Sequence, residues 1–107
     1  MTDQLSAALT MLHQQLKELD GISKQTAEDL NAVAGKERIV KWKAKTVPLI
    51  ERYVGRKEAQ QFAGKQPGPS FTYDLFEEFN DEIEFYRTVL LALVKDVKSK
   101  ALPAGGA

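Results

Sequence analysis

Few residues in this chain could carry out chemistry. It contains one histidine, His13, and no cysteine. A thiol nucleophile, a disulfide, a thiolate metal site and a pair of histidine ligands within one chain are therefore excluded. His13 stands among Gln14, Gln15 and Lys17, which supply neither a nucleophile nor a carboxylate to orient the imidazole. The common glycine-rich phosphate loops are also missing from the sequence. We therefore expect no enzyme activity, no metal and no cofactor.

Acidic residues between positions 74 and 84 are the next candidates, because carboxylates bind hard cations. This segment has six acids and no base, but it lacks the alternating ligands and central glycine of a calcium loop. It also lacks the Glu-x-x-His motif of a di-iron bundle. The helical spacing instead predicts an acidic stripe along one helix face, made of Asp74, Glu77, Asp81 and Glu84.

Basic residues gather in an earlier segment. The chain has 15 basic and 15 acidic residues, yet residues 36 to 57 hold eight bases and two acids. On a helical wheel five of these bases form a basic stripe beside Trp42, namely Arg38, Lys41, Lys45, Arg52 and Arg56. Three interpretations are open. Both stripes face solvent, or they pair within a chain or between neighbours, or the basic stripe binds phosphate or nucleic acid while Trp42 or Tyr53 stacks on it.

Apolar periodicity predicts that helices position all of these residues. Leucine recurs with spacing 4-3-4-3 near the N-terminus, at Leu5, Leu9, Leu12, Leu16 and Leu19. This narrow seam is typical of a helix that pairs with another helix. We expect this helix to span residues 3 to 20 and to end at Gly21, because glycine is favoured just after a helix. A weaker helix at 24 to 34, with Val33 on its apolar face, would be closed by Gly35.

The middle of the chain predicts a third helix from 36 to 54. Its apolar face centres on Trp42 and is widened by Val40. Pro48 interrupts this helix and predicts a kink, since proline removes one backbone hydrogen bond. Gly55 is expected to end the helix in the left-handed conformation. A short helical turn at 57 to 63, with Phe62 inward, and a loop at 64 to 70 follow.

The last helix, from about 73 to 100, has the strongest amphipathic pattern. Its apolar stripe consists of Leu75, Phe76, Phe79, Ile83, Tyr86, Val89, Leu90, Leu93, Val94 and Val97. Thr72 is the expected N-cap, and Phe71 and Phe76 occupy the positions of a hydrophobic staple. Residues 101–107 are expected to form a flexible C-terminal tail.

Together these elements predict an all-α protein with a single helical domain over residues 1–100. We expect a compact antiparallel bundle of four to five helices with a long amphipathic C-terminal helix. The longest apolar run is six residues, from Val89 to Val94, against the roughly 20 that a membrane span requires. The N-terminus lacks the features of a signal peptide. A cytoplasmic protein that does not contact a membrane is therefore expected.

Three apolar residues fall outside the predicted core stripes: Met11, Phe85 and Leu91. Together with the acidic stripe they are the candidate contacts of a non-catalytic protein–protein interaction or oligomerisation module, whose partner is a second copy or another protein. The alternative function is binding of nucleic acid or a phosphate ligand through the basic stripe and Trp42. Counterion release would make such binding weaken steeply with salt.

A longer pattern runs from Ile39 to Phe62. It reads Trp-x-x-x-Thr-x-x-Leu-[apolar]-x-Arg-[aromatic]-[apolar]-Gly-x(6)-Phe, beginning at Trp42. This pattern resembles small helical segments ahead of effector domains in prokaryotic proteins, including predicted nucleotide-binding and TIR-like proteins of anti-phage systems. The resemblance implies a non-catalytic adaptor or regulator in a prokaryotic defence-type system. It also implies mainly fold-defining roles for Trp42, Thr46, Leu49, Arg52, Tyr53 and Gly55. A detached subunit, an inhibitor and an excised domain all remain open, because no effector domain follows.

Overall fold

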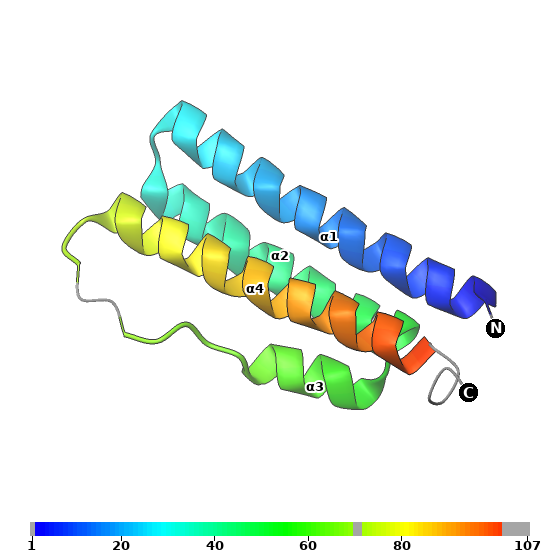
Figure 1. Cartoon of the computed structure of the whole chain (residues 1–107). Coiled ribbons are helices and arrows are strands. Elements are labelled where there is room, and N and C mark those ends of the chain that lie inside the picture. Colours follow the sequence, from blue (N-terminus) through cyan, green and yellow to red (C-terminus); the bar gives the residue numbers. More distant parts are fainter. Residues whose placement is uncertain (1, 70–71, 102–107) are drawn as a thin grey trace.

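The computed structural model describes residues 2–69 and 72–101, and this part of the chain forms four helices (Figure 1). They are α1 (Thr2–Asp29), α2 (Ala32–Tyr53), α3 (Arg56–Gly64) and α4 (Leu75–Ala101). The long helix α1 runs antiparallel to α2 and α4, and the short α3 runs back along the bundle (Figure 1). The prediction of an all-α bundle with a long C-terminal helix is confirmed. The predicted tail lies outside the described residues, apart from Ala101 at the end of α4.

The first helix is longer than the sequence indicated. α1 continues through Gly21 to Asp29, so the predicted end at Gly21 and the separate helix at 24 to 34 are both wrong. Space is open around Gly21, since a Cβ built there meets no atom within 4 Å apart from its chain neighbours and the adjoining backbone of its own helix. A glycine inside a helix lowers the stability of that helix by about 1 kcal/mol relative to alanine. The packing of this 28-residue helix outweighs that cost.

Leu30 and Asn31 alone connect α1 to α2. Leu30 has a φ of 53°, which is the left-handed region that leucine rarely adopts. The Asn31 side chain caps α2 by accepting a hydrogen bond from the Ala34 amide at 3.0 Å. The Asn31 amide donates to Asp29 Oδ1 at 3.1 Å, and Arg38 donates to the other oxygen of Asp29 at 2.6 Å. The chain therefore reverses direction at a strained leucine, and hydrogen bonds of the flanking residues Asp29 and Asn31 hold the turn.

Substitution of Leu30 by glycine should stabilise the protein. Glycine adopts the left-handed conformation without the steric penalty, so we expect the free energy of unfolding to rise by about 1 kcal/mol in urea denaturation. Leu30→Ala is the matched control, because alanine removes the same side chain but keeps the Cβ that causes the strain. A rise for both variants alike would contradict the backbone explanation.

Gly35 lies inside α2, so its predicted role as a helix terminator is wrong. A Cβ at this position would lie 2.5 Å from Thr26 Cγ2 on α1 and 2.7 Å from Phe79 Cε1 on α4. Thr26 and Phe79 are both buried. Glycine is therefore required here because three helices approach one another too closely for any larger residue.

α2 continues through Pro48 to Tyr53, as the uninterrupted apolar face predicted. The amides of Val54 and Gly55 both donate to the Ile50 carbonyl, at 2.8 and 2.9 Å, and this closes the helix. Gly55 has a φ of 162°, which is extended backbone. The prediction of a left-handed glycine cap is therefore wrong.

The segment after α2 lies alongside the long helices and completes the bundle. α3 buries Phe62, as predicted, and ends at Gly64. The chain then runs on without helical structure alongside the long helices (Figure 1). The Lys65 carbonyl ties it down, because it accepts hydrogen bonds from Lys43 Nζ at 2.6 Å and from the Tyr86 hydroxyl at 3.5 Å.

Asp74 is the residue that caps α4. Its Oδ1 accepts hydrogen bonds from the amides of Phe76 at 2.9 Å and Glu77 at 3.3 Å. Thr72 Oγ1 accepts from the Asp74 amide at 3.0 Å, so Thr72 supports the cap and does not provide it as predicted. Phe71, the predicted partner of Phe76 in a staple, lies outside the described residues.

The core runs the length of the bundle between the long helices. Its fully buried apolar residues include Leu12, Leu19, Ile39, Ile50, Phe79, Ile83 and Leu90. These belong to the leucine seam, the α2 face and the α4 stripe that the sequence predicted. None of the helices in the described part of the chain is long and apolar enough to cross a membrane.

Candidate functional site

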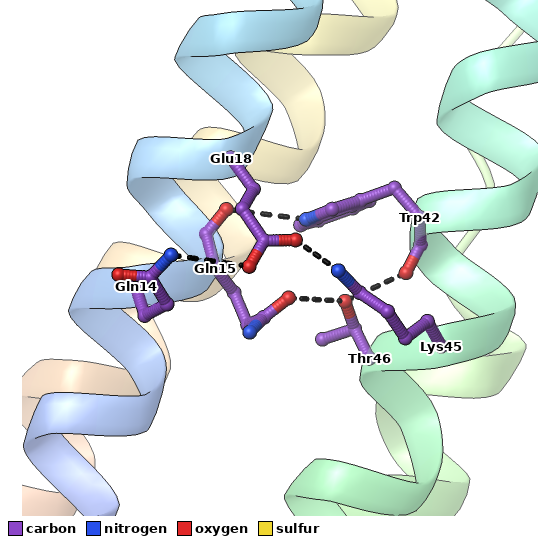
Figure 2. A network of polar contacts seen from close by, with 6 residues as sticks. All are labelled: Gln14, Gln15, Glu18, Trp42, Lys45 and Thr46. Atoms are coloured by element: carbon purple, nitrogen blue, oxygen red, sulfur yellow. Dashed lines mark hydrogen bonds and ion pairs between the residues drawn. The ribbon is translucent and has the colours of Figure 1, made fainter.

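A buried polar network joins α1 to α2 (Figure 2). Trp42 is 3% exposed, and its indole Nε1 donates a hydrogen bond to the Gln15 carbonyl at 3.1 Å. Thr46 Oγ1 lies 2.7 Å from the Trp42 carbonyl and 3.2 Å from Gln15 Oε1, and its single hydrogen can serve only one of them at a time. The Gln15 and Thr46 side chains are themselves buried. This network therefore fixes the register of the two helices.

Trp42 is also the centre of an aromatic cluster. Its ring centroid lies 6.0 Å from that of Phe62 and 5.8 Å from that of Tyr86, both in edge-to-face geometry. Such pairs contribute about 0.5–1.5 kcal/mol beyond their buried area. The prediction that Trp42 stacks on a ligand is wrong, because the indole is packed inside the bundle. Its role in this structure is to hold the helices together.

Glu18 belongs to the same network (Figure 2), and its side chain is partly exposed. It forms an ion pair with Lys45 and accepts a hydrogen bond from Gln14 Nε2 at 3.2 Å. Burial acts to raise the pKa of Glu18, but the hydrogen bonds from Lys45 and Gln14 outweigh it and hold the pKa below its usual range. Glu18 therefore stays ionised and extends the contact between α1 and α2 to the surface.

The basic stripe meets α1 and does not meet the acidic stripe. Arg38 pairs with Asp29 at 2.6 Å, and Lys45 pairs with Glu18. Between the two stripes the described residues form no ion pair. Pairing of the stripes within one chain is therefore not what this structure shows. The remaining members of the basic stripe, Lys41, Arg52 and Arg56, are exposed, as is the whole acidic stripe.

A hollow of about 450 Å³ lies near the start of α4, between Lys36, Phe85 and residues 67–69. Lys36 Nζ is 2.5 Å from Glu78 Oε1 and 3.7 Å from Glu82 Oε2. Burial raises the pKa of Glu82, although the Lys36 ammonium acts in the opposite direction. Lys36 therefore compensates Glu78, whereas Glu82 Oε2 is buried without a hydrogen-bond partner. No group of side chains in the described part is arranged to hold a metal ion.

The residues predicted as protein contacts do not form one surface. Met11 is 7% exposed and packs in the core, so the prediction that it lies off the core is wrong. Phe85 is half-buried, with its ring centroid 5.1 Å from that of Tyr86. Leu91 is 50% exposed, as predicted. Sequence reasoning placed Met11 beside the leucine seam, but the interior contacts a wider arc of α1 than that seam.

A set of exposed apolar residues before and along α2 was not predicted to be exposed. Leu30, Val33 and Val40 are 76%, 58% and 66% exposed, and Ala44 and Pro48 further along α2 are also exposed. The spacing of these residues from 33 onward places them on one side of α2, which they share with the exposed Glu37 and Glu51. We name these five residues the α2 apolar row. The seven-residue spacing of Val33 and Val40 does indicate one side of a helix. The apolar periodicity, however, predicts that both residues lie on buried faces.

Comparison of the chain with protein-family models, with curated proteins and with solved structures finds no match. The resemblance of the Ile39–Phe62 segment to prokaryotic effector-associated helices therefore stays a prediction. The candidate site rests on its own geometry.

Proposed function

We propose that this protein is a non-catalytic protein–protein interaction module that uses the α2 apolar row as its contact surface. The observation that carries this proposal is the exposure of Leu30, which directly precedes α2, and of Val33 and Val40 on one side of the first half of α2. Single exposed apolar residues are ordinary on protein surfaces, whereas several on one side of a helix are typical of contact surfaces.

The backbone of Leu30 supports the same proposal. A leucine in the left-handed conformation loses about 1–2 kcal/mol relative to glycine, and here the side chain gains little burial in return. Strained residues of this kind cluster at binding and switch positions, where the strain is tolerated for function. The chain therefore holds an aliphatic side chain outward at a place where glycine or asparagine would suit the fold better.

The alternative function, binding of a nucleic acid or phosphate through the basic stripe, is less well supported. Arg38 and Lys45 are engaged by carboxylates of α1, and Trp42 is buried. A role as adaptor or regulator in a prokaryotic defence-type system is a narrower form of our proposal. It rests only on the resemblance of the Ile39–Phe62 segment.

Site-specific photocrosslinking tests the proposed contact surface. A photoreactive amino acid at Val40 should give crosslinked protein adducts in the cells that naturally produce the protein. The same amino acid at Leu91, on α4 and similarly exposed, is the matched control and should give few. Circular dichroism of both purified variants checks that they fold. An absence of adducts at Val40, or equal yields at the two positions, would contradict the proposal.

A further inference from the structure

We infer that the groove between α1 and α2 binds an acidic amphipathic helix of a partner protein. This groove lies on the side of α2 that faces α1, where Arg38 and Lys45 form ion pairs with α1. The α2 apolar row lies on the outward side of α2, so the inference goes beyond the proposed function. Three features carry it, namely the shape of the groove, the small side chains along α1 and the positive charge along α2.

Two adjoining hollows form the groove. One, of about 510 Å³, lies between residues 18–25 of α1 and residues 38–45 of α2. The other, of about 570 Å³, lies between residues 6–15 of α1 and residues 49 and 53 of α2. Because α1 and α2 run antiparallel, the end of one hollow meets the start of the other. Along α2 the hollows span residues 38 to 53, or about 22 Å, which matches a helix of about 15 residues.

The short helix α3 does not cover this groove. It lies on the far side of the bundle from α1 (Figure 1), where Phe62 packs against Trp42 of α2 and Tyr86 of α4. α3 therefore covers the junction of α2 and α4. The junction of α1 and α2 is left for a helix from outside the chain.

The α1 side of the groove consists of small or uncharged side chains apart from Glu18. They are Ser6, Ala7, Thr10, Gln14, Gly21 and Gln25. Packing within this chain does not require glycine at position 21, because the space around it is open. Small residues instead allow a second helix to approach closely. The half-buried Ile22 and Leu49 also line the hollows and offer apolar contacts to such a helix.

Positive charge is concentrated at one end of the groove. Arg38, Lys41 and Lys45 line the first hollow, and Glu18 is the one acidic residue that lines it. Lys41 is exposed and forms no ion pair within the described part of the chain. The Lys45 side chain pairs with Glu18 but is still 54% exposed. Lys41 and Lys45 are about one helical turn apart, so two carboxylates with the same spacing on a partner helix can approach both.

A phosphate backbone would fit this groove less well than an acidic helix. None of the residues that line the second hollow is charged, so cations contact only one end of the groove. A nucleic acid of the same length would leave most of its phosphates without a cation, and phosphate contacts dominate such binding. An amphipathic helix needs carboxylates in one half only, and its apolar side chains can fill the other half.

Titration with two matched peptides tests the inference by nuclear magnetic resonance of the full, isotope-labelled chain. One synthetic helical peptide of about 18 residues has leucines along one face and glutamates beside them, and its counterpart has lysine in place of each glutamate. The acidic peptide should shift the amide signals of Gln14, Gly21 and Lys41 and leave that of Leu91 unchanged. The lysine peptide should shift none of them.

Two variants with matched controls locate the contact. Lys41→Glu should raise the dissociation constant of the acidic peptide about fivefold, the scale of one exposed ion pair, whereas Lys95→Glu on α4 should not change it. Gly21→Leu should keep the fold, because the space is open, but raise the dissociation constant about tenfold, because leucine fills the groove. Ala27→Leu, at an exposed position of α1 outside the hollows, should leave the dissociation constant unchanged.

The inference is wrong if the acidic peptide does not bind at about 1 mM, or if both peptides bind equally. Unchanged affinity in Lys41→Glu, or shifts confined to residues outside the groove, would also overturn it. So would tighter binding of a short oligonucleotide at the same residues, which would assign the groove to nucleic acid. Each of these results leaves the α2 apolar row standing as a contact surface, because Val40 does not line the groove.

Discussion

Replacement of Trp42 by alanine should lower the free energy of unfolding by about 3–5 kcal/mol, the range for a large aromatic side chain removed from a packed core. Trp42 belongs to the polar network and also packs against Phe62 on α3 and Tyr86 on α4. Its removal leaves a cavity between four helices and breaks the hydrogen bond to the Gln15 carbonyl. Urea denaturation followed by circular dichroism measures the loss.

Two variants separate the causes of this loss. Trp42→Phe keeps an aromatic ring but has no N–H donor and less volume, so its effect should be intermediate. Leu91→Ala, at a half-exposed position of α4, should change the free energy of unfolding by about 0.5 kcal/mol or less. A loss below about 1 kcal/mol for Trp42→Ala would show that the indole does not hold the helices together as its contacts indicate.

Substitution of Gly35 by alanine should destabilise the protein by about 1–3 kcal/mol, the range for overpacking a well-filled interior. The added methyl group would meet Thr26 and Phe79 at distances that neither buried side chain can relieve without moving α1 or α4. Gly21→Ala is the matched control in α1, where the space is open. It should raise stability by about 0.5–1 kcal/mol, because alanine favours the helix.

A double-mutant cycle identifies the contact responsible. Thr26→Ser removes the Cγ2 atom that lies nearest to the added methyl group and keeps the hydroxyl that accepts a hydrogen bond from Arg38. The loss for Gly35→Ala should therefore be smaller in the Thr26→Ser background. Losses that add to within about 0.3–0.5 kcal/mol would rule out this contact as the cause.

The all-α fold and the apolar faces of its long helices were predictable from the sequence, but the division of residues 20 to 36 between α1 and α2 was not. The leucine seam and the α4 stripe are periodic over several turns, and burial of one helix face produces that period directly. Glycine, in contrast, can stand in a sequence for reasons that a local pattern does not distinguish. Gly35 is required by the approach of other helices, and the left-handed position that glycine usually takes is held by Leu30.

The surfaces were harder to predict than the helices. A helical wheel shows that α2 has an apolar arc, but which part of a wide arc faces the interior depends on where the neighbouring helices lie. Val40 belongs to the exposed part and Ile39 to the buried part, although they are adjacent in sequence. The partners of Arg38 and Lys45 likewise depend on α1 lying beside α2, which no charge count reveals.

The position of Trp42 also determines what can be observed in solution. It is the single tryptophan of the chain, and it contacts Gln15 on α1, Phe62 on α3 and Tyr86 on α4. Its fluorescence should therefore report the assembly of the entire bundle. Because the indole is buried away from the exposed side of α2, its emission should not respond to association there. Folding and association can thus be followed as separate signals in one sample.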